Sequence, residues 1–477
     1  MKGDRIKKYG IGVLLVLIVA LAVVFHFEIY FENALTGLPE TDFGVGISNW
    51  RILFEPFLGP LLFLNRSIYA LRELPMVFLW VLIVYLVFSG IFGREGFRKK
   101  KIGNVLLNVL LMLGICFSIF VLILFVPLPN NTIVNNSKNA VLVTTHAHTE
   151  YSHDGLISQE GMWRWHQKNG FDAFFITDHA NHKKSLEFAQ AQRKGAFPMS
   201  PLVLVGQEHS GSNHMSLLGL DGAFETKRMS DEAVVDSVHA HRGVVIINHW
   251  FDGKGKEKEF YRHLGADGFE IENVGSDLYY DRDLFSNLKK FCSENDMLMV
   301  GGLDFHGYGR ACSVYNAFEI PNWDIMDPVA KEHAILTILK DGPQEKIKIL
   351  IYKDRPYYSD SNLIFRPFFT VIDYFRTLHM LQVISWVFWV ILFCFIGKWM
   401  KSTYIDFDLW VILLAGASAL FLLVLAMVYY VKGEKVKGYS DMYTEYMGIL
   451  GPVGLVLLII SLFAGYFRFF KPTAKSI

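Results

Sequence analysis

Long apolar runs lie at both ends of this chain and flank a polar middle. The runs have about the length needed to cross a bilayer. They occupy roughly residues 10–31, 74–92, 104–127, 379–397, 408–431 and 446–467. The polar middle begins after PLPNNTIVNN, a proline- and asparagine-rich stretch typical of a linker. The pattern therefore predicts two groups of three transmembrane helices around one inserted domain.

We expect five parts along the chain. In order, these are an N-terminal membrane region at 1–127, a linker at 128–137, a folded domain at 138–358, a connector at 359–378 and a C-terminal membrane region at 379–477. Within the first part, the apolar stretch ILFEPFLGPLLFL is short and is broken by Pro56 and Pro60. Such a stretch is typical of an interfacial or re-entrant segment.

Basic residues indicate how the chain is oriented in the membrane. The loop between the second and third runs carries Arg94, Arg98, Lys99, Lys100 and Lys101, which marks it as cytoplasmic. Six crossings then leave both termini in the cytoplasm and the inserted domain outside it. The lysines at 432, 435 and 437 oppose this orientation, and one span miscounted before residue 128 would invert the domain.

The first apolar run resembles a signal peptide at its basic start. It continues into aromatic residues without a small-residue cleavage site, and further runs follow. An uncleaved first helix is therefore the favoured interpretation. The whole protein is predicted to be an integral protein of the cytoplasmic membrane, with the lipid bilayer as a partner.

Short apolar segments inside the polar domain each end in polar residues. Examples are FDAFFITDH, PLVLVGQEH, GVVIINH and MLMVGGLDFH. Continuously apolar strands are usually buried on both faces, which favours a parallel sheet or barrel covered by helices. Helices are expected at SQEGMWRWHQKNG, with Ser158 as cap and Gly170 as terminator, and at SDEAVVDSVHAHRG. The domain is therefore predicted to be α/β.

Composition narrows the class of protein. Hydrophobic residues make up 52% of the chain, which is too apolar for an ordinary soluble protein. Basic and acidic residues balance at 46 each, so we expect no nucleic-acid partner. Of four cysteines, Cys292 and Cys312 lie in the polar domain. A disulfide and two unlinked thiols both stay open for this pair.

Histidines and carboxylates gather at the ends of the predicted strands. In VLVTTHAH, His146 and His148 are two residues apart and face the same side of an extended segment. Imidazole nitrogens and carboxylate oxygens suit zinc, manganese or iron. The pattern predicts a multinuclear metal site at the strand ends. The candidate ligands are His146, His148, Asp154, His179, Glu208, His214, His249, Asp304 and His306.

These residues lie in motifs that resemble a known family. HAHTEYSHDG, TDH, GQEH, NHMSLLGL, INHW and GGLDFHGYGR look like the successive motifs of the polymerase and histidinol phosphatase (PHP) family, in the same order, over about residues 140–320. The resemblance implies a distorted (β/α)7 TIM-like barrel. It also implies two or three divalent metal ions at the open end of that barrel.

The resemblance assigns each candidate ligand to an ion. The first ion would take His146, His148, Glu208 and Asp304. Glu208 would bridge to a second ion, which would also take His214 and His249. The third ion would take Asp154, His179 and His306.

Two further residues are candidates for supporting catalysis. Asp178 precedes His179 and is expected to accept a hydrogen bond from an imidazole, although a strand-end cap is equally compatible with its position. Arg310 follows His306 by four residues and could grip phosphate oxygens with its guanidinium. A surface salt bridge is the alternative for Arg310.

Other polar side chains are candidates for substrate contact. His153 is expected to face substrate or to support a ligand, and Asn273 could contact substrate. Glu270 and Glu272 alternate on one strand. One of the two could line the cavity, but solvated strand residues are the favoured interpretation.

The resemblance implies a membrane-anchored phosphoesterase. A metal-bound hydroxide, supported by Asp178 and Arg310, would hydrolyse a phosphate ester of a small molecule or of a lipid-linked substrate. A metal-dependent amidohydrolase and an extracytoplasmic ligand-binding or sensory module are the alternatives. Transport by the helices is less favoured, because few ionisable residues interrupt the apolar runs.

Overall fold

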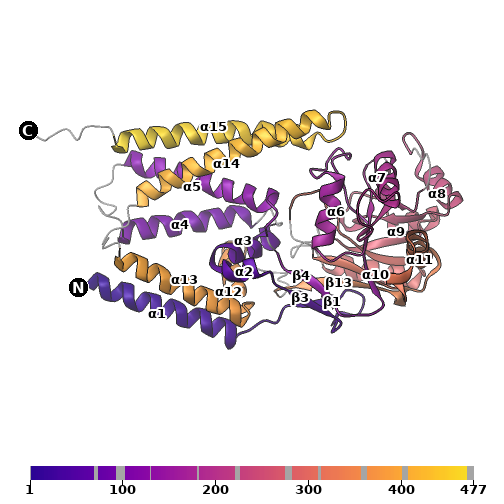
Figure 1. The fold of residues 1–477 in the computed structure, drawn as a ribbon, viewed down its shortest axis with the longest axis horizontal. Helices are drawn as coiled ribbons and strands as arrows, with labels where there is room; N and C mark the ends of the chain where they lie inside the picture. The colour runs from indigo at the N-terminus through magenta and orange to yellow at the C-terminus, as the bar shows by residue number, and fades with distance from the viewer. Residues whose placement is uncertain are drawn as a thin grey trace, which may run out of the picture.

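The fold combines an α/β domain with a layer of apolar helices (Figure 1). The computed structural model describes residues 2–68, 73–92, 102–128, 130–179, 182–220, 226–273, 282–309, 313–355, 362–399 and 407–469. The predicted basic loop at 94–101, together with Arg310 and Cys312, lies outside these described residues. Cys292 is a free, buried thiol.

A large mixed sheet forms the centre of the α/β domain. Its strands lie in the order β11-β10-β9-β8-β7-β6-β5-β12-β13-β1-β2. The first strands along the domain are β5 (Ala140–Thr144), β6 (Ala173–Ile176), β7 (Leu202–Ser210), β8 (His214–Leu218) and β9 (Val244–Ile247). They are followed by β10 (Gly268–Asn273), β11 (Leu298–Gly302), β12 (Val314–Glu319) and β13 (Ile347–Lys353).

Strand direction departs from a uniformly parallel sheet. β5, β6 and β7 are parallel, as are β9, β10 and β11, but β8 runs antiparallel to both of its neighbours. β8 is antiparallel because only three residues separate it from β7, so the two strands form a hairpin. β12 is antiparallel to β5 and β13.

The chain beyond β11 returns to the chain beyond β5. The amide of Asp304 donates to the His146 carbonyl (3.0 Å), and the amide of His148 donates to the Phe305 carbonyl (2.9 Å). Between β12 and β11, the Asn316 side chain accepts a hydrogen bond from the Gly301 amide (2.7 Å) and donates one to the Gly301 carbonyl (2.8 Å). The sheet therefore curves so that two distant strand ends meet.

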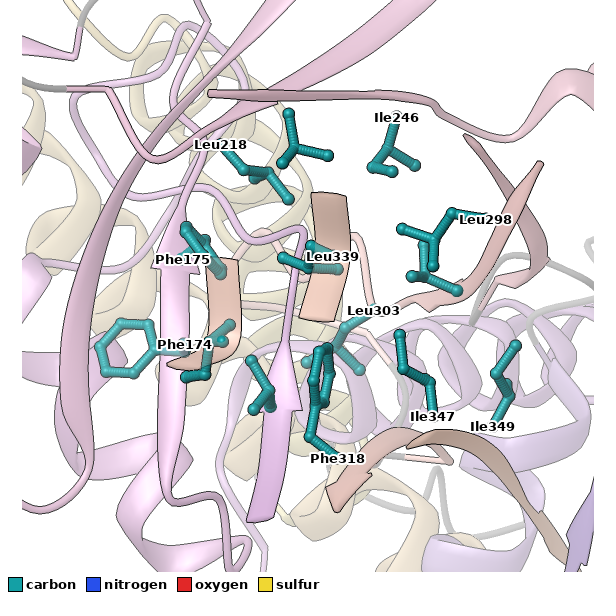
Figure 2. Packing of buried hydrophobic residues seen from close by; sticks show 14 of the residues in the cluster. Phe174, Phe175, Leu218, Ile246, Leu298, Leu303, Phe318, Leu339, Ile347 and Ile349 are labelled. Atoms are coloured by element: carbon teal, nitrogen blue, oxygen red, sulfur yellow. The ribbon is translucent and has the colours of Figure 1, made fainter. Parts of the chain in front are cut away.

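The strands that the sequence indicates are buried on both faces. Every residue of β6, β9 and β11 is buried, which confirms the expectation from their continuous apolar runs. β10 is also buried throughout, although its Glu270 and Glu272 were expected to be solvated. Phe175, Ile246 and Phe318 come from three different strands and lie around a common interior (Figure 2). Leu339 of α11 (Pro328–Asp341) joins them there.

Short helices connect the strands. They are α6 (Gln159–Lys168), α7 (Lys183–Arg193), α8 (Asp231–Ala240), α9 (Lys258–Leu264) and α10 (Arg282–Glu294). Ser158 caps α6, as expected, by accepting a hydrogen bond from the Gly161 amide (3.1 Å). Gly170 follows α6 with φ +81°, a backbone conformation that favours glycine.

Residues near the N-terminus add strands to this domain. β1 (Tyr30–Asn33) pairs antiparallel with β13, and β2 (Leu38–Pro39) pairs with β1. β3 (Phe43–Gly46) pairs with β4 (Thr132–Asn135) in a second, small sheet. Residues 30–46 were expected in the N-terminal membrane region, but they lie with the sheet because alternate side chains such as Phe31 are buried against it.

Helices of the other layer lie side by side in Figure 1. They are α1 (Lys2–Val23), α4 (Leu74–Phe92), α5 (Ile102–Phe125), α13 (Met380–Trp399), α14 (Phe407–Lys435) and α15 (Met442–Phe469). The short α2 (Asn49–Leu53), α3 (Glu55–Ile68) and α12 (Arg366–Arg376) lie between this layer and the sheet domain.

Three stretches within these helices are long and apolar enough to cross a membrane. They are Gly103–Phe125, Asp408–Lys435 and Met442–Arg468. A fourth span is possible only if Arg366–Arg376 and Met380–Ile396 count together, and that pair is bent by 109°. The helices α1 and α4 contain shorter apolar stretches. Six spans, the side of each terminus and the side of the domain therefore stay predictions.

Candidate metal centre

Glu208 lies at the middle of the histidine and carboxylate cluster. It is 1% exposed and occupies β7 close to the turn into β8. Its carboxylate oxygens lie 2.9 Å from His179 Nε2 and 3.2 Å from His214 Nδ1. They also lie 3.2 Å from the Nε2 atoms of His146 and His148. One carboxylate therefore faces four imidazoles.

A second carboxylate joins the histidines on the other side of His148. Asp154 Oδ2 lies 3.3 Å from His179 Nε2 and 3.1 Å from His306 Nε2. The imidazole of His148 stacks on that of His306, with ring centroids 4.4 Å apart. Ser152 steadies Asp154 by donating a hydrogen bond to Oδ1 (2.6 Å).

Asp304 and His249 complete the cluster. Asp304 Oδ1 lies 3.2 Å from His146 Nε2 and 3.4 Å from His148 Nε2, while His249 Nε2 lies 3.7 Å from Glu208 Oε1. The structure thus brings all nine predicted ligands together, each with a nitrogen or oxygen within 3.7 Å of another member.

Two cluster residues have an unusual backbone conformation. His249 follows β9 with φ +28°, and Asp304 follows β11 with φ +48°. Residues other than glycine adopt positive φ at a cost, and such positions often occur at functional sites. Here the conformation turns both side chains from the strand ends into the cluster.

Glu270 supports the cluster in a way that the sequence did not predict. It was expected among solvated strand residues, but Glu270 and Glu272 are both buried in β10, at 0% and 2% exposure. Glu270 Oε1 accepts a hydrogen bond from His146 Nδ1 (2.8 Å). This contact directs His146 Nε2 toward Glu208 and Asp304. The burial follows from β10 being covered on both faces.

Asn273 contacts the same supporting carboxylate, Glu270. It is 3% exposed, and its amide donates to Glu270 Oε2 (3.1 Å). The backbone amide of His249 donates to that oxygen as well (3.1 Å). A contact between Asn273 and substrate stays a prediction.

For Asp178, the sequence left two roles open, an acceptor for an imidazole and a strand-end cap. Both of its oxygens are bound by Thr149, through the backbone amide (2.5 Å) and the hydroxyl (2.7 Å). These contacts are with the turn after His148 rather than with an imidazole. Burial raises the pKa of Asp178 to about 6, against the effect of the two Thr149 hydrogen bonds.

Two residues of the site have no counterpart among the predicted ones. Asn248 precedes His249, and its amide donates to Glu208 Oε1 (2.6 Å). Asp252 lies 3.1 Å from His249 Nδ1 and so orients the far side of that ring. Their position beside the candidate ligand His249, in the segment INHWFD, is the sequence feature that could have indicated them.

The predicted substrate-facing residue His153 has a side chain that is 64% exposed beside Asp154.

The cluster has a strong electrostatic preference for positive charge. Burial alone lowers the pKa of His146, but Asp304, Glu208 and Glu270 outweigh it and raise that pKa well above its usual value. In His249, burial is likewise outweighed by Asp252 and Glu208, and the pKa rises to about 10. Burial raises the pKa of Asp304, but neighbouring histidines reverse this and the pKa falls. The carboxylates therefore concentrate positive charge here, as protons or as cations.

The donor geometry fits divalent metal ions. Zinc and similar ions bind imidazole nitrogen and carboxylate oxygen at about 2.0–2.2 Å, so two ligands of one ion lie about 3.0–3.4 Å apart. The distances from Glu208 to His146, His148 and His214 are each 3.2 Å. Four groups of three residues have donor atoms close enough to share an ion, and they include both Glu208 and Asp154.

Comparison with known proteins identifies the class of this domain. Residues 144–230 match the family model of the PHP domain. That range includes the candidate ligands from His146 to His214. The resemblance in the sequence is thereby confirmed over these residues. No curated protein matches the chain.

Several solved structures are similar to parts of the chain. A protein of Bifidobacterium adolescentis described as a metal-dependent phosphoesterase has 18% identity and a TM-score of 0.30, and the match covers 35% of this chain and 88% of that one. A two-domain protein of Bacteroides vulgatus with a predicted PHP-like metal-dependent phosphoesterase has 16% identity and a TM-score of 0.32, with coverage of 48% and 69%. PsfC of Pseudomonas syringae has 14% identity and a TM-score of 0.31, with coverage of 50% and 98%.

Proposed function

We propose that this chain is a membrane-anchored, metal-dependent phosphoesterase. The observation that carries the proposal is the convergence of six imidazoles on three carboxylates, those of Glu208, Asp154 and Asp304. The PHP domain match over residues 144–230 supports the same class of reaction. The proposed arrangement of the domain is a distorted (β/α)7 barrel between two groups of membrane helices, with the domain outside the cytoplasm.

In this proposal the nine side chains hold two or three divalent ions. Glu208 would contribute to more than one ion, because its Oε2 faces His148 and its Oε1 faces His214. When bound, zinc, manganese or iron ions supply a water of lowered pKa and neutralise the charge on a phosphoryl group. Glu270 and Asp252 keep His146 and His249 in the orientation that presents a ring nitrogen to the centre.

The remaining polar side chains would receive the substrate. His153 is exposed beside Asp154 and His179 and is not needed as a ligand, so we assign it to contact with the phosphate ester. The role of Arg310 as a clamp on phosphate oxygens stays a proposal from the sequence. Asp178 is proposed to act through Thr149, by fixing the turn that follows His148.

The test is hydrolysis by the full-length protein in detergent. The full chain is needed because β1 and β2 come from residues 30–39. We expect hydrolysis of aryl phosphate monoesters or diesters that is lost with a chelator and restored by manganese or zinc. His148→Ala and Asp304→Ala should each abolish turnover, while His333→Ala on exposed α11 surface should not. Chelator-resistant hydrolysis, or none with any metal, would refute the proposal.

A further inference from the structure

A cavity of about 400 Å³ lies between two apolar helices and the loop after β11. Its walls include Val121 and Leu124 of α5, Ile449 of α15 and Tyr308 of the loop. Among the described residues that line it, only the tyrosine hydroxyls add polar side-chain atoms. A cavity of this size and character suits a hydrocarbon group rather than a polar one.

The cavity adjoins the candidate metal centre. Tyr308 follows His306 by two residues, and the centroids of their rings are 6.2 Å apart. The amide of Gly309 donates to the Leu124 carbonyl of α5 (3.0 Å), which fixes this loop against the helix. One loop therefore forms the wall of the cavity and carries a candidate metal ligand.

The helices are also attached to the other metal-binding loop. Ser440 and Asp441, in the turn between α14 and α15, donate to the carbonyls of Gly155 (2.6 Å) and His153 (3.0 Å). Leu156, two residues beyond Asp154, packs into the same apolar cluster as α5, α14 and α15 residues. These contacts fix the position of the cavity relative to the candidate metal centre.

We propose that the cavity binds the hydrocarbon chain of a lipid phosphate whose phosphoryl group lies at the metal centre. This inference rests on the proposed phosphoesterase function and names its substrate class. α5 and α15 are both long and apolar enough to cross a membrane, so a cavity between them is accessible to lipid chains. Ile449 is 50% exposed, consistent with an opening at the helix surface. A water-soluble phosphate ester would leave these hydrocarbon walls unused.

Hydrolysis of such a substrate is balanced without another reactant. The oxygen of water forms a bond to phosphorus, and the bond from phosphorus to the lipid oxygen breaks. That lipid oxygen takes a proton and leaves as the hydroxyl of the lipid product. The chain remains in the cavity until the product exchanges with the bilayer.

Chain length provides the first test, with the full-length protein in detergent. The substrates are butyl, hexyl and octyl phosphate below their micellar concentrations, with an aryl phosphate as reference. Each buried methylene should lower KM by up to about fourfold, so we expect KM for octyl phosphate to be at least about tenfold below that for butyl phosphate. A KM independent of chain length, with aryl phosphate still hydrolysed, would overturn the lipid inference and leave the phosphoesterase in place.

Two variants of α15 distinguish binding in the cavity from partition of the longer substrates into detergent micelles. Ile449→Trp fills the cavity, whereas Leu455→Trp places the same side chain at a position that is 52% exposed and outside the lining. Both positions are exposed, so neither change should unfold the helix. We expect the chain-length effect to disappear in Ile449→Trp and to remain in Leu455→Trp, with aryl phosphate turnover unchanged in both. Equal behaviour of the variants contradicts the inference.

Photolabelling tests binding without relying on activity. Nanodiscs of phosphatidylcholine would contain a phosphatidic acid with a diazirine at the end of its chain. We expect labelled peptides from α5 and α15 around the cavity, with labelling reduced at least about fivefold in Ile449→Trp but not in Leu455→Trp, as the loss of a filled apolar cavity implies. Equal labelling by a diazirine phosphatidylcholine would mean bulk lipid only and would overturn the inference. If no substrate is hydrolysed with any metal, the phosphoesterase proposal fails, and photolabelling still decides lipid binding.

Discussion

At the scale of single residues, the cluster depends on buried carboxylates that fix the imidazoles. Glu270 accepts hydrogen bonds from His146 Nδ1, the His249 amide and Asn273 (2.8, 3.1 and 3.1 Å). It therefore holds two candidate ligands without being one itself. Groups of this kind orient the ring and make its free nitrogen a better ligand.

Glu270→Gln should weaken metal binding while preserving the fold. The amide keeps the shape of the side chain but removes the charge, so we expect metal affinity and turnover to fall about 10–100-fold. Competition with a fluorescent chelator measures the metal affinity. A pH profile of turnover tests whether the loss of the Glu270 charge changes the titration of His146. Glu319→Gln, at the exposed end of β12, is the matched control. Unchanged affinity in Glu270→Gln would show that this carboxylate does not position His146.

His166 should make the domain sensitive to acid. Burial lowers the pKa of His166 to about 3, although its Nδ1 donates to the Met162 carbonyl (2.9 Å). The unfolded chain takes up this proton near pH 6.5, so stability is present above that pH and is lost as the pH falls toward 3. Between pH 7 and pH 5 the loss from this residue is about 2 kcal/mol.

The variant His166→Phe isolates this contribution. It keeps a ring against Phe174, whose centroid lies 4.1 Å from that of His166, but cannot titrate. Chemical unfolding at pH 7 and pH 5 should show a loss smaller by about 2 kcal/mol than in the wild type. His333→Phe, on the exposed surface of α11, should behave like the wild type. An identical pH dependence in His166→Phe would contradict the account of its burial.

Residue types, their spacing and the resemblance to the PHP family together selected the nine side chains that lie together. Each follows or ends an apolar strand, and strand ends meet in an α/β sheet. Glu270, Asn248 and Asp252 were not selected, because a supporting role depends on which ring lies opposite. The Asp178 partner could not be predicted either, since Thr149 reaches it only after the turn beyond His148 has formed.

At the scale of elements, local pattern identified the strands and two helix caps but not all of the pairing. Continuous burial of β6, β9 and β11 followed from their sequences, but the burial of Glu270 and Glu272 in β10 did not. The antiparallel direction of β8 depends on a short turn between polar residues. The pairing of β1 with β13 joins Tyr30 to Lys353. A local sequence pattern cannot predict a contact between residues so far apart in the sequence.

Phe31→Ala tests whether β1 is part of the metal-binding domain. Phe31 is 1% exposed and packs edge-on against Tyr315 and Tyr352. Its truncation should lower the free energy of unfolding of the domain by about 3–5 kcal/mol. Leu38→Ala, at a position 64% exposed in β2, should change it by less than about 0.5 kcal/mol. Equal effects of the two substitutions would mean that β1 does not pack on the sheet in solution.

At the scale of the whole molecule, the helices α5, α14 and α15 pack against the loops that carry candidate metal ligands. Leu156 and Tyr308, which lie beside candidate ligands, pack among residues of α5, α14 and α15. The apolar runs predicted the helices, but their contact with the metal-binding loops depends on tertiary packing that no run of sequence specifies. This contact is the basis for proposing a lipid phosphate as the substrate.

The number of metal ions bound by the full-length protein tests the central claim most directly. Plasma mass spectrometry after loading with zinc or manganese and extensive dialysis should give two or three ions per chain. Glu208→Gln should lose at least one of them, because this buried carboxylate faces four imidazoles, whereas the exposed Glu232→Gln on α8 should lose none. A wild-type protein that retains no divalent ion, or a Glu208→Gln protein with the full complement, would contradict the account.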